Sequence, residues 1–190
     1  MLLEIFIIKY GNDALEAISK NIDPDLIKKL DDFGVKPSDY DNFRIIGRES
    51  AETVAEAAAE VEKFAYLLKT EKNIAFFWSG KTNGIGVADR ALEIARERGG
   101  TTLEKIIETK GINMPEWNIN DAKSVEIWRQ ASLKYAQQAS GEVWAVIGSS
   151  VREDSIWLQY ELPALTNNIN VTKITVIDPE TLVETVIFTR

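Results

Sequence analysis

From residue 73 onward, short apolar runs rich in β-branched residues alternate with longer segments of helical periodicity. The runs expected to form strands are 74–78, 143–147, 155–160, 171–177 and 182–188. This alternation is typical of an α/β fold, in which helices connect neighbouring parallel strands. Only a few residues separate the last two runs, so we expect these to form an antiparallel hairpin. The sequence therefore predicts a small, mainly parallel sheet flanked by helices.

The helices expected between these strands have recognisable ends. They are a stretch up to Arg98, the segment Leu103–Lys110, and a longer helix from Asp121 or Ser124 to about Ser140. Thr101 or Thr102 can cap the second helix, and Gly141 is expected to end the third.

Residues 1–70 also have the pattern of helices. The expected segments are Ala14–Lys20, Asp25–Asp32 and Ala51–Lys69. The last of these has apolar residues at helical spacing and many glutamates on its solvated face. We therefore predict two parts, a helical N-terminal or linker region over residues 1–70 and an α/β domain over residues 71–190.

The composition excludes several kinds of site. The 190 residues include no histidine and no cysteine, so the chain has no Ser-His-Asp or Cys-His nucleophile, no Cys/His zinc site and no disulfide. The net charge of −8 makes nucleic acid or an anionic membrane surface a poor main partner. No apolar run has the length of a membrane span, and the opening segment lacks the features of a signal peptide. Carboxylates, aromatic faces, hydroxyls and backbone dipoles remain for chemistry, and no metal site is expected.

A glycine-rich loop over residues 79–86 leads from the first expected strand into a helix. Such a position suits phosphate binding at a helix N-terminus, with Ser79 and Lys81 as candidate pyrophosphate contacts. The spacing matches neither a P-loop nor a Rossmann fingerprint. A simple flexible turn explains the glycines equally well, so both interpretations stay open.

Four residues at the ends of expected elements are candidate site residues. Trp78 ends the first strand and Trp128 lies in the helix expected to end near Ser140, and each taken alone is typical of a core residue. Glu104 lies in the first turn of its helix, where any acid favours the helix dipole. Glu161 follows the run 155–160, and the carboxyl ends of strands are where ligands bind in α/β sheets.

Together these segments resemble the ADP-ribosyl cyclase and NAD glycohydrolase superfamily. The matching pieces, in order, are Phe77–Ser79, Thr102–Glu104, Ser124–Trp128 with Ser132, and Ser155–Trp157 leading to Glu161. The resemblance covers residues 73–177 and implies an ADP-ribosyl cyclase-like catalytic domain. The chain lacks the disulfides of the animal members, and Lys105 follows Glu104 where the family normally has aspartate.

The resemblance also implies a role for each candidate residue. Trp78 and Trp128 would flank the nicotinamide of NAD or NADP, Glu161 would be the catalytic carboxylate, and Glu104 would steer hydrolysis against cyclisation. Ser132 would lie near the ribose. The phosphates would meet Ser79, Lys81 and the backbone of Ile156 and Trp157. NAD is the substrate in this interpretation, and no cofactor is expected.

The residues before this domain suggest a biological setting. The segment 8–14 and the helix rich in alanine and glutamate look like the connectors that precede C-terminal toxin domains in bacterial polymorphic toxins. We therefore expect an NAD-depleting toxin of the contact-dependent inhibition kind, acting in the cytosol of a target cell, with a cognate immunity protein. The alternatives are a cytoplasmic ADP-ribosyl cyclase that is not a toxin, and a non-catalytic nucleotide-binding module on the same fold. An ADP-ribosyltransferase is disfavoured because its motifs are missing.

Overall fold

The computed structural model describes residues 52–190, of which Ala58–Arg190 form one compact unit. The unit begins in a helix that ends at residue 62, followed by the 3-10 turn η2 (Ala65–Leu68). The predicted helix Ala51–Lys69 is therefore too long, because tight i to i−3 hydrogen bonds from Lys63 and Phe64 end it early. The helices predicted at Ala14–Lys20 and Asp25–Asp32 lie outside the described residues. The boundary at residue 70 stays a prediction.

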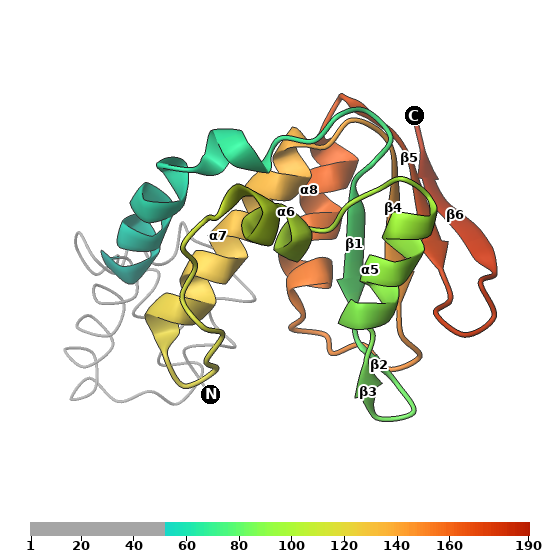
Figure 1. Cartoon of the computed structure of the whole chain (residues 1–190), viewed down its shortest axis with the longest axis horizontal. Helices are drawn as coiled ribbons and strands as arrows, with labels where there is room; N and C mark the ends of the chain where they lie inside the picture. The colour runs from blue at the N-terminus through green and yellow to red at the C-terminus, as the bar shows by residue number, and fades with distance from the viewer. Residues whose placement is uncertain (1–51) are drawn as a thin grey trace, which may run out of the picture. The chain divides into compact units, whose positions relative to one another are not determined.

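A four-stranded sheet forms the centre of this unit (Figure 1). Its strands, in spatial order, are β1 (Phe76–Ser79), β4 (Gly141–Ile147), β5 (Val171–Ile177) and β6 (Glu184–Thr189). The first three are parallel, and β6 pairs with β5 in the antiparallel sense. The predicted α/β class, the mainly parallel sheet and the terminal hairpin are thus confirmed.

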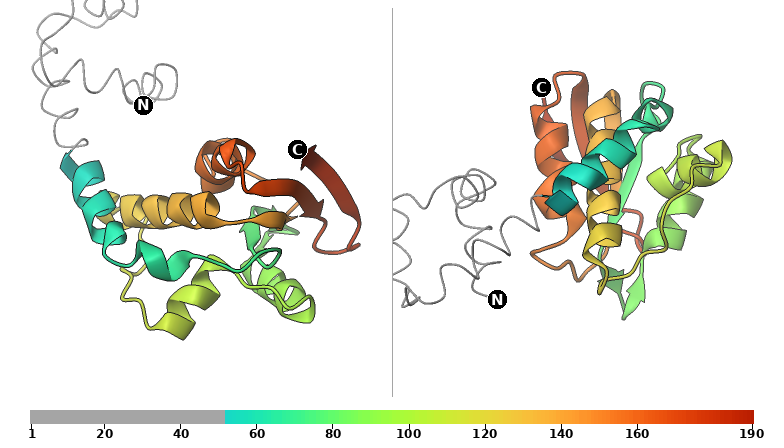
Figure 2. Two further views of the ribbon diagram at one scale, coloured as in Figure 1. Left: turned by 90° about the horizontal axis from the view of Figure 1, so that it is seen from above. Right: turned by 90° about the vertical axis from the view of Figure 1, so that its left-hand side faces the viewer.

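Four α-helices surround the sheet: α5 (Ala88–Glu97), α6 (Leu103–Lys110), α7 (Ala122–Gln138) and α8 (Leu162–Asn167). Figure 2 shows α5 on one side of the sheet and α8 on the other. The helix α7 reaches the sheet through Tyr135, whose ring contacts Phe77 of β1. The predicted caps explain two of the boundaries. The Thr102 side chain accepts a hydrogen bond from the Lys105 N–H at the start of α6, and the Asp121 side chain accepts one from the Lys123 N–H at the start of α7.

The two faces of β1 contribute to different parts of the core. Phe76 belongs to a cluster with residues of α5, β4 and β5, including Ile94 and Val146. Phe77 points the other way, and its ring centroid lies 4.8 Å from that of Tyr135 in α7 and 6.0 Å from that of Trp157. Successive strand residues alternate between faces, so this short strand joins both helical layers.

The run 155–160 is not a strand, contrary to the prediction. Residues Trp157–Glu161 form a π-helical turn, η3, which continues directly into α8. The Ser155 side chain accepts a hydrogen bond from the Leu158 N–H, and the Ser155 carbonyl accepts one from the Gln159 N–H, so the chain coils at this point. Trp157 and Glu161 are buried while the intervening Leu158 and Gln159 are exposed. This spacing is helical, and the apparent alternation in the sequence was misleading.

The glycine-rich loop forms a small antiparallel hairpin of β2 (Lys81–Thr82) and β3 (Ile85–Gly86) before α5. Its two turn residues, Asn83 and Gly84, have positive φ angles of 54° and 80°. This is the backbone of a two-residue hairpin turn that favours Asn-Gly. We predicted that Gly141 ends the preceding helix, and this is wrong. The helix α7 ends at Gln138, and Gly141 is the first residue of β4.

Candidate active site

Two carboxyl groups and an indole meet beside the carboxyl end of β1. The Trp78 Nε1–H donates a hydrogen bond of 2.9 Å to Glu104 Oε1, joining β1 to the first turn of α6. The backbone fixes this approach, because the Phe76 N–H donates to the Thr101 carbonyl at 2.9 Å just before α6 begins. Trp78 and Glu104 are both half-buried.

Glu161 is the buried acid of the site, with only 7% of its surface exposed. Burial and the nearby negative charge of Glu104 raise its pKa from the ordinary value of 4.5 to about 8, and a hydrogen bond with the Ser132 side chain opposes this shift. At neutral pH Glu161 is therefore mainly protonated when no cation lies beside it. The structure brings together Trp78, Glu104, Ser132 and Glu161.

Tyr135 lies on α7 one turn after Ser132, and sequence reasoning gave it only a packing role. Its hydroxyl donates to the Thr101 carbonyl at 2.9 Å and is shared with the Phe76 carbonyl at 3.3 Å. Burial, together with the charges of Glu104 and Glu161, raises the pKa of this phenol well above its usual range. Tyr135 therefore ties β1, α6 and α7 together directly beside the acids. Its helical spacing from Ser132 is the signal that could have indicated this position.

Trp128 lies four residues before Ser132 and thus on the same face of α7. Its Nε1–H donates a hydrogen bond of 3.0 Å to the Pro115 carbonyl in the segment between α6 and α7. Trp128 is half-buried, so part of its ring is accessible. Its predicted contact with nicotinamide stays a prediction.

The predicted phosphate contacts lie at the end of β1, in β2 and at the start of η3. Ser79 is buried, and its carbonyl accepts a hydrogen bond of 2.9 Å from the Gly148 N–H. Lys81 has an exposed side chain, and its backbone exchanges hydrogen bonds of 2.9 and 3.0 Å with Ser150. The Trp157 side chain is buried against Phe77, so only its backbone remains for a ligand, as for the half-buried Ile156 beside it.

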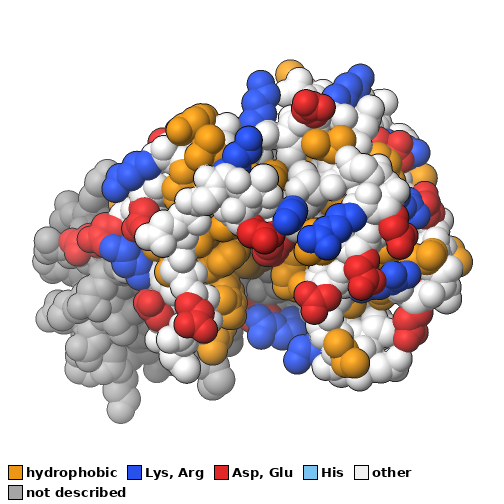
Figure 3. All heavy atoms as spheres, in the orientation of Figure 1, with side chains coloured by type: hydrophobic (Ala, Val, Ile, Leu, Met, Phe, Trp, Pro, Cys, Tyr) orange, Lys and Arg blue, Asp and Glu red, His pale blue; other side chains and the backbone are white. Residues whose placement is uncertain are grey.

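Figure 3 shows this face of the molecule hollowed near its middle, with apolar side chains along one wall, acidic ones above and basic ones below. An aromatic and acidic site with cations at its edge suits a ligand that carries a flat cationic ring and phosphates. Within residues 52–190, no three acidic side chains are grouped so that they can hold a metal ion. None of the helices described there combines the length and the apolar character of a membrane span.

No protein family and no curated protein matches the sequence. Among solved structures, the chain is similar to Aplysia cyclase complexed with substrate NGD and product cGDPR, at 30% identity and a TM-score of 0.44, over 58% of this chain and 50% of that chain. It is likewise similar to an ADP-ribosyl cyclase complexed with N1-cIDPR, at 29% identity and a TM-score of 0.44, over 58% of this chain and 51% of that chain. The similarity to CD38 has 16% identity and a TM-score of 0.48, over 88% of this chain and 73% of that chain. The chain thus spans about half the length of the cyclases it matches.

Proposed function

We propose that this protein cleaves the bond between nicotinamide and ribose in NAD or NADP, with hydrolysis as the main outcome and cyclisation as a minor one. The observation that carries the proposal is the buried Glu161 next to the Glu104 and Trp78 pair. Nicotinamide is attached as a pyridinium and leaves as a neutral molecule, so its departure needs no general acid. The barrier lies in the positive charge that develops on the ribose, and a buried carboxylate can oppose that charge.

The reaction begins when the cationic ring enters between Trp78 and Trp128. Stacking and cation–π attraction favour the pyridinium there, each contributing on the order of 1 kcal/mol. Its positive charge favours the ionised form of Glu161, which releases its proton to solvent. Ser132, whose side chain hydrogen-bonds Glu161 and favours its ionised form, then orients the carboxylate.

In the bond-breaking step, the electron pair of the C1′–N bond moves to the pyridinium nitrogen, and neutral nicotinamide leaves. The ribose carries the positive charge as an oxocarbenium ion facing Glu161. Water adds to C1′, and its proton passes to one of the two carboxylates and then to solvent. Glu104 stands beside Glu161 and biases the choice between water and the adenine ring of the same substrate.

The rest of the substrate lies along the loops after β1 and β4. We assign its phosphates to Ser79, Lys81 and the backbone of Ile156 and Trp157. NAD or NADP is consumed, and no separate cofactor takes part. We assign no role to nucleic acid or to insertion in a membrane.

The direct test is incubation with NAD and with NADP, followed by chromatography of nicotinamide, ADP-ribose and cyclic ADP-ribose products. Release of nicotinamide that Glu161→Gln abolishes would support the proposal. Binding of NAD without nicotinamide release would instead favour the non-catalytic nucleotide-binding module. A mainly cyclic product would make the protein an ADP-ribosyl cyclase.

The biological role we propose is that of a toxin that depletes NAD in the cytosol of a target cell, with a cognate immunity protein in the producer. This setting derives from the segment 8–14, which lies outside the described residues. Expression in a bacterial cytosol should lower cellular NAD and stop growth, and the Glu161→Gln variant should do neither. Normal growth despite active protein would argue for a cytoplasmic enzyme without a toxin role.

A further inference from the structure

Within residues 52–190, the proposed reaction leaves one buried carboxylate without a role. Glu126 lies on α7 and is 7% exposed. Its Oε1 accepts a hydrogen bond of 2.8 Å from Gln130 Nε2, and its Oε2 lies 3.5 Å from Arg129 Nη1. A buried acid is costly unless it is paired and hydrogen-bonded, so this group holds the guanidinium of Arg129 in place.

Arg129 in turn reaches the segment that carries the catalytic candidate. Its guanidinium carbon lies over the ring of Tyr160, 5.6 Å from the ring centroid. Tyr160 directly precedes Glu161 in the π-helical turn η3. The chain of contacts Glu126, Arg129, Tyr160 therefore runs from α7 to the residue next to the buried acid.

The π-helical turn needs such support from outside. Turns with i to i+5 hydrogen bonds are rare and occur mostly as single turns at functional sites. Return to α-helical geometry would shift the register by one residue, which is a rotation of about 100° in the direction of a side chain. Glu161 would then leave its place beside Ser132.

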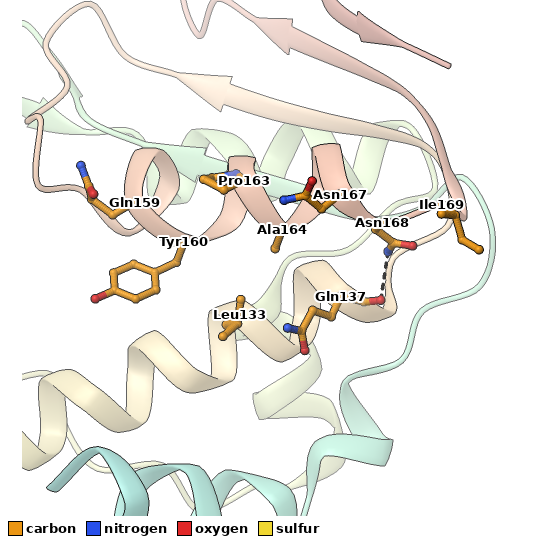
Figure 4. Close-up of a pocket in the computed structure, with 9 residues that line it drawn as sticks. All are labelled: Leu133, Gln137, Gln159, Tyr160, Pro163, Ala164, Asn167, Asn168 and Ile169. Carbon is orange, nitrogen blue, oxygen red and sulfur yellow. Dashed lines mark hydrogen bonds between the residues drawn. The ribbon is translucent and has the colours of Figure 1, made fainter. Parts of the chain in front are cut away.

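Packing beside Tyr160 is incomplete. A groove of about 590 Å³ lies between α7 and the segment η3–α8, lined by residues such as Leu133, Tyr160 and Pro163. Figure 4 shows the Tyr160 ring extending from η3 beside this groove, toward α7. Because this side of the ring faces open space, the guanidinium of Arg129 is a main restraint on where the ring lies.

We propose that Arg129 is a positioning residue: anchored by Glu126, it holds Tyr160 and thereby keeps the π-helical turn in the register that directs Glu161 into the site. Trp157 anchors the other end of the same turn in the core against Phe77. The role in turnover rests on the proposed function, whereas the effect on the turn does not.

The test compares Arg129→Gln, Arg129→Lys and the parent protein. Arg129→Gln should lower kcat by about 10- to 100-fold with KM changed less than about twofold, because misplacement of a catalytic group has effects of this size. Amides of residues 157–161 should exchange hydrogen faster in this variant. Arg129→Lys keeps a cation over the ring and should recover most of both properties.

Arg90→Gln is the matched control, since Arg90 also pairs with a glutamate three residues away, Glu93, on a helix far from η3. It should leave kcat and exchange in η3 unchanged. If Arg129→Gln also lowers the melting temperature, Tyr160→Leu serves as a second variant, because it leaves the Glu126 and Arg129 pair intact. It must then show the same loss of kcat and of amide protection in η3.

Parental kcat together with parental amide protection in Arg129→Gln would overturn the proposal. Equal losses in Arg129→Lys and Arg129→Gln would also overturn it, because the cation would then not be the feature that matters. If the parent protein cleaves no NAD, the proposed function fails, and amide exchange alone decides the role of Arg129.

Discussion

The helices α5 and α7 pack against opposite faces of β1 and bury different chemistry. The buried residues of α5 are all apolar, namely Ala91, Ile94 and Ala95. The buried residues of α7 include Ser124, Glu126, Ser132 and Tyr135. Burying polar groups lowers stability unless each finds a partner, so α7 maintains polar groups for the candidate site, whereas α5 supplies only apolar packing, including the cluster on which Trp78 rests. Variants on the two sides should therefore separate stability from activity.

The largest expected effect is on turnover and comes from the α7 side. Glu161→Gln keeps the shape of the side chain but removes the charge that faces the ribose cation. Turnover of NAD should fall about 100- to 1000-fold, equivalent to about 3–4 kcal/mol, while the melting temperature at neutral pH should not fall. Steady-state kinetics and thermal unfolding on the same sample check both. Glu108→Gln is the control, because Glu108 lies on the exposed face of α6. Parental turnover in Glu161→Gln would show that another group opposes the positive charge on the ribose.

The counterpart on the α5 side is Ile94→Ala. Ile94 is fully buried, so its truncation should lower the free energy of unfolding by about 3 kcal/mol through lost burial and a cavity. The value of kcat per folded molecule should fall far less than in Glu161→Gln, because α5 contributes no group to the site and Ile94 meets it only through the cluster on which Trp78 packs. Denaturant unfolding and active-site titration measure the two quantities. A large fall in kcat without loss of stability would contradict the division between the sides.

The third expected effect is on the pH dependence of the parent protein. Since the pKa of Glu161 is about 8 and the reaction uses its ionised form, kcat/KM should rise roughly 50-fold between pH 6 and pH 8 and then level off. Initial rates at subsaturating NAD measure this profile. A flat profile over this range would mean that Glu161 does not act in its ionised form.

Stability should change in the opposite direction over the same range. The folded chain keeps the proton on Glu161 up to about pH 8, whereas the unfolded chain loses it near the ordinary value of 4.5. The contribution of Glu161 to the free energy of unfolding is therefore fully present below pH 4.5 and is lost as the pH rises through 8. Between these two pH values the free energy of unfolding should fall by up to about 1.4 kcal/mol per pH unit. Denaturant unfolding at several pH values should show this slope in the parent protein and not in Glu161→Gln.

The smallest expected effect concerns the choice of product. Glu104→Ala should raise the ratio of cyclic to linear product roughly threefold, equivalent to less than 1 kcal/mol, and nicotinamide release should fall less than in Glu161→Gln. Lys105→Ala is the matched control, because the Lys105 ammonium pairs with Glu108 at 2.7 Å rather than with the site. If Glu104→Ala changes only the melting temperature, Glu104 serves the helix N-terminus alone.

Local signals in the sequence predicted most of the fold. The helix α6 has the predicted bounds because a Thr102 cap and the left-handed Gly111 define both ends chemically. Strand β5 also has the predicted bounds, since a β-branched run lies between turn residues. Such signals are local, so they can be read without knowledge of the tertiary structure.

The sequence named the candidate site residues but did not indicate their geometry. Glu161 was assigned to the end of a strand, because Ser155 to Tyr160 alternates in polarity over too few residues to separate a strand from a helical turn. The π-helical register depends on contacts made by Trp157 and Tyr160 with distant elements. The Trp78 to Glu104 hydrogen bond joins residues 26 positions apart, and no local pattern indicates it.

The interlocked loops after β1 and β4 have a consequence for how this protein can diversify. A Cβ atom at Gly148 would lie 2.6 Å from the Lys81 carbonyl oxygen, and one at Gly80 would lie 2.5 Å from that of Ser150. Neither loop can accept a side chain there without moving the other, so this part of the rim resists both substitution and insertion. Residues 117–120, which follow the Pro115 carbonyl that accepts the Trp128 hydrogen bond, are exposed and tolerate replacement more easily. Changes in substrate range, whether by natural drift or by directed evolution, should therefore accumulate in that segment.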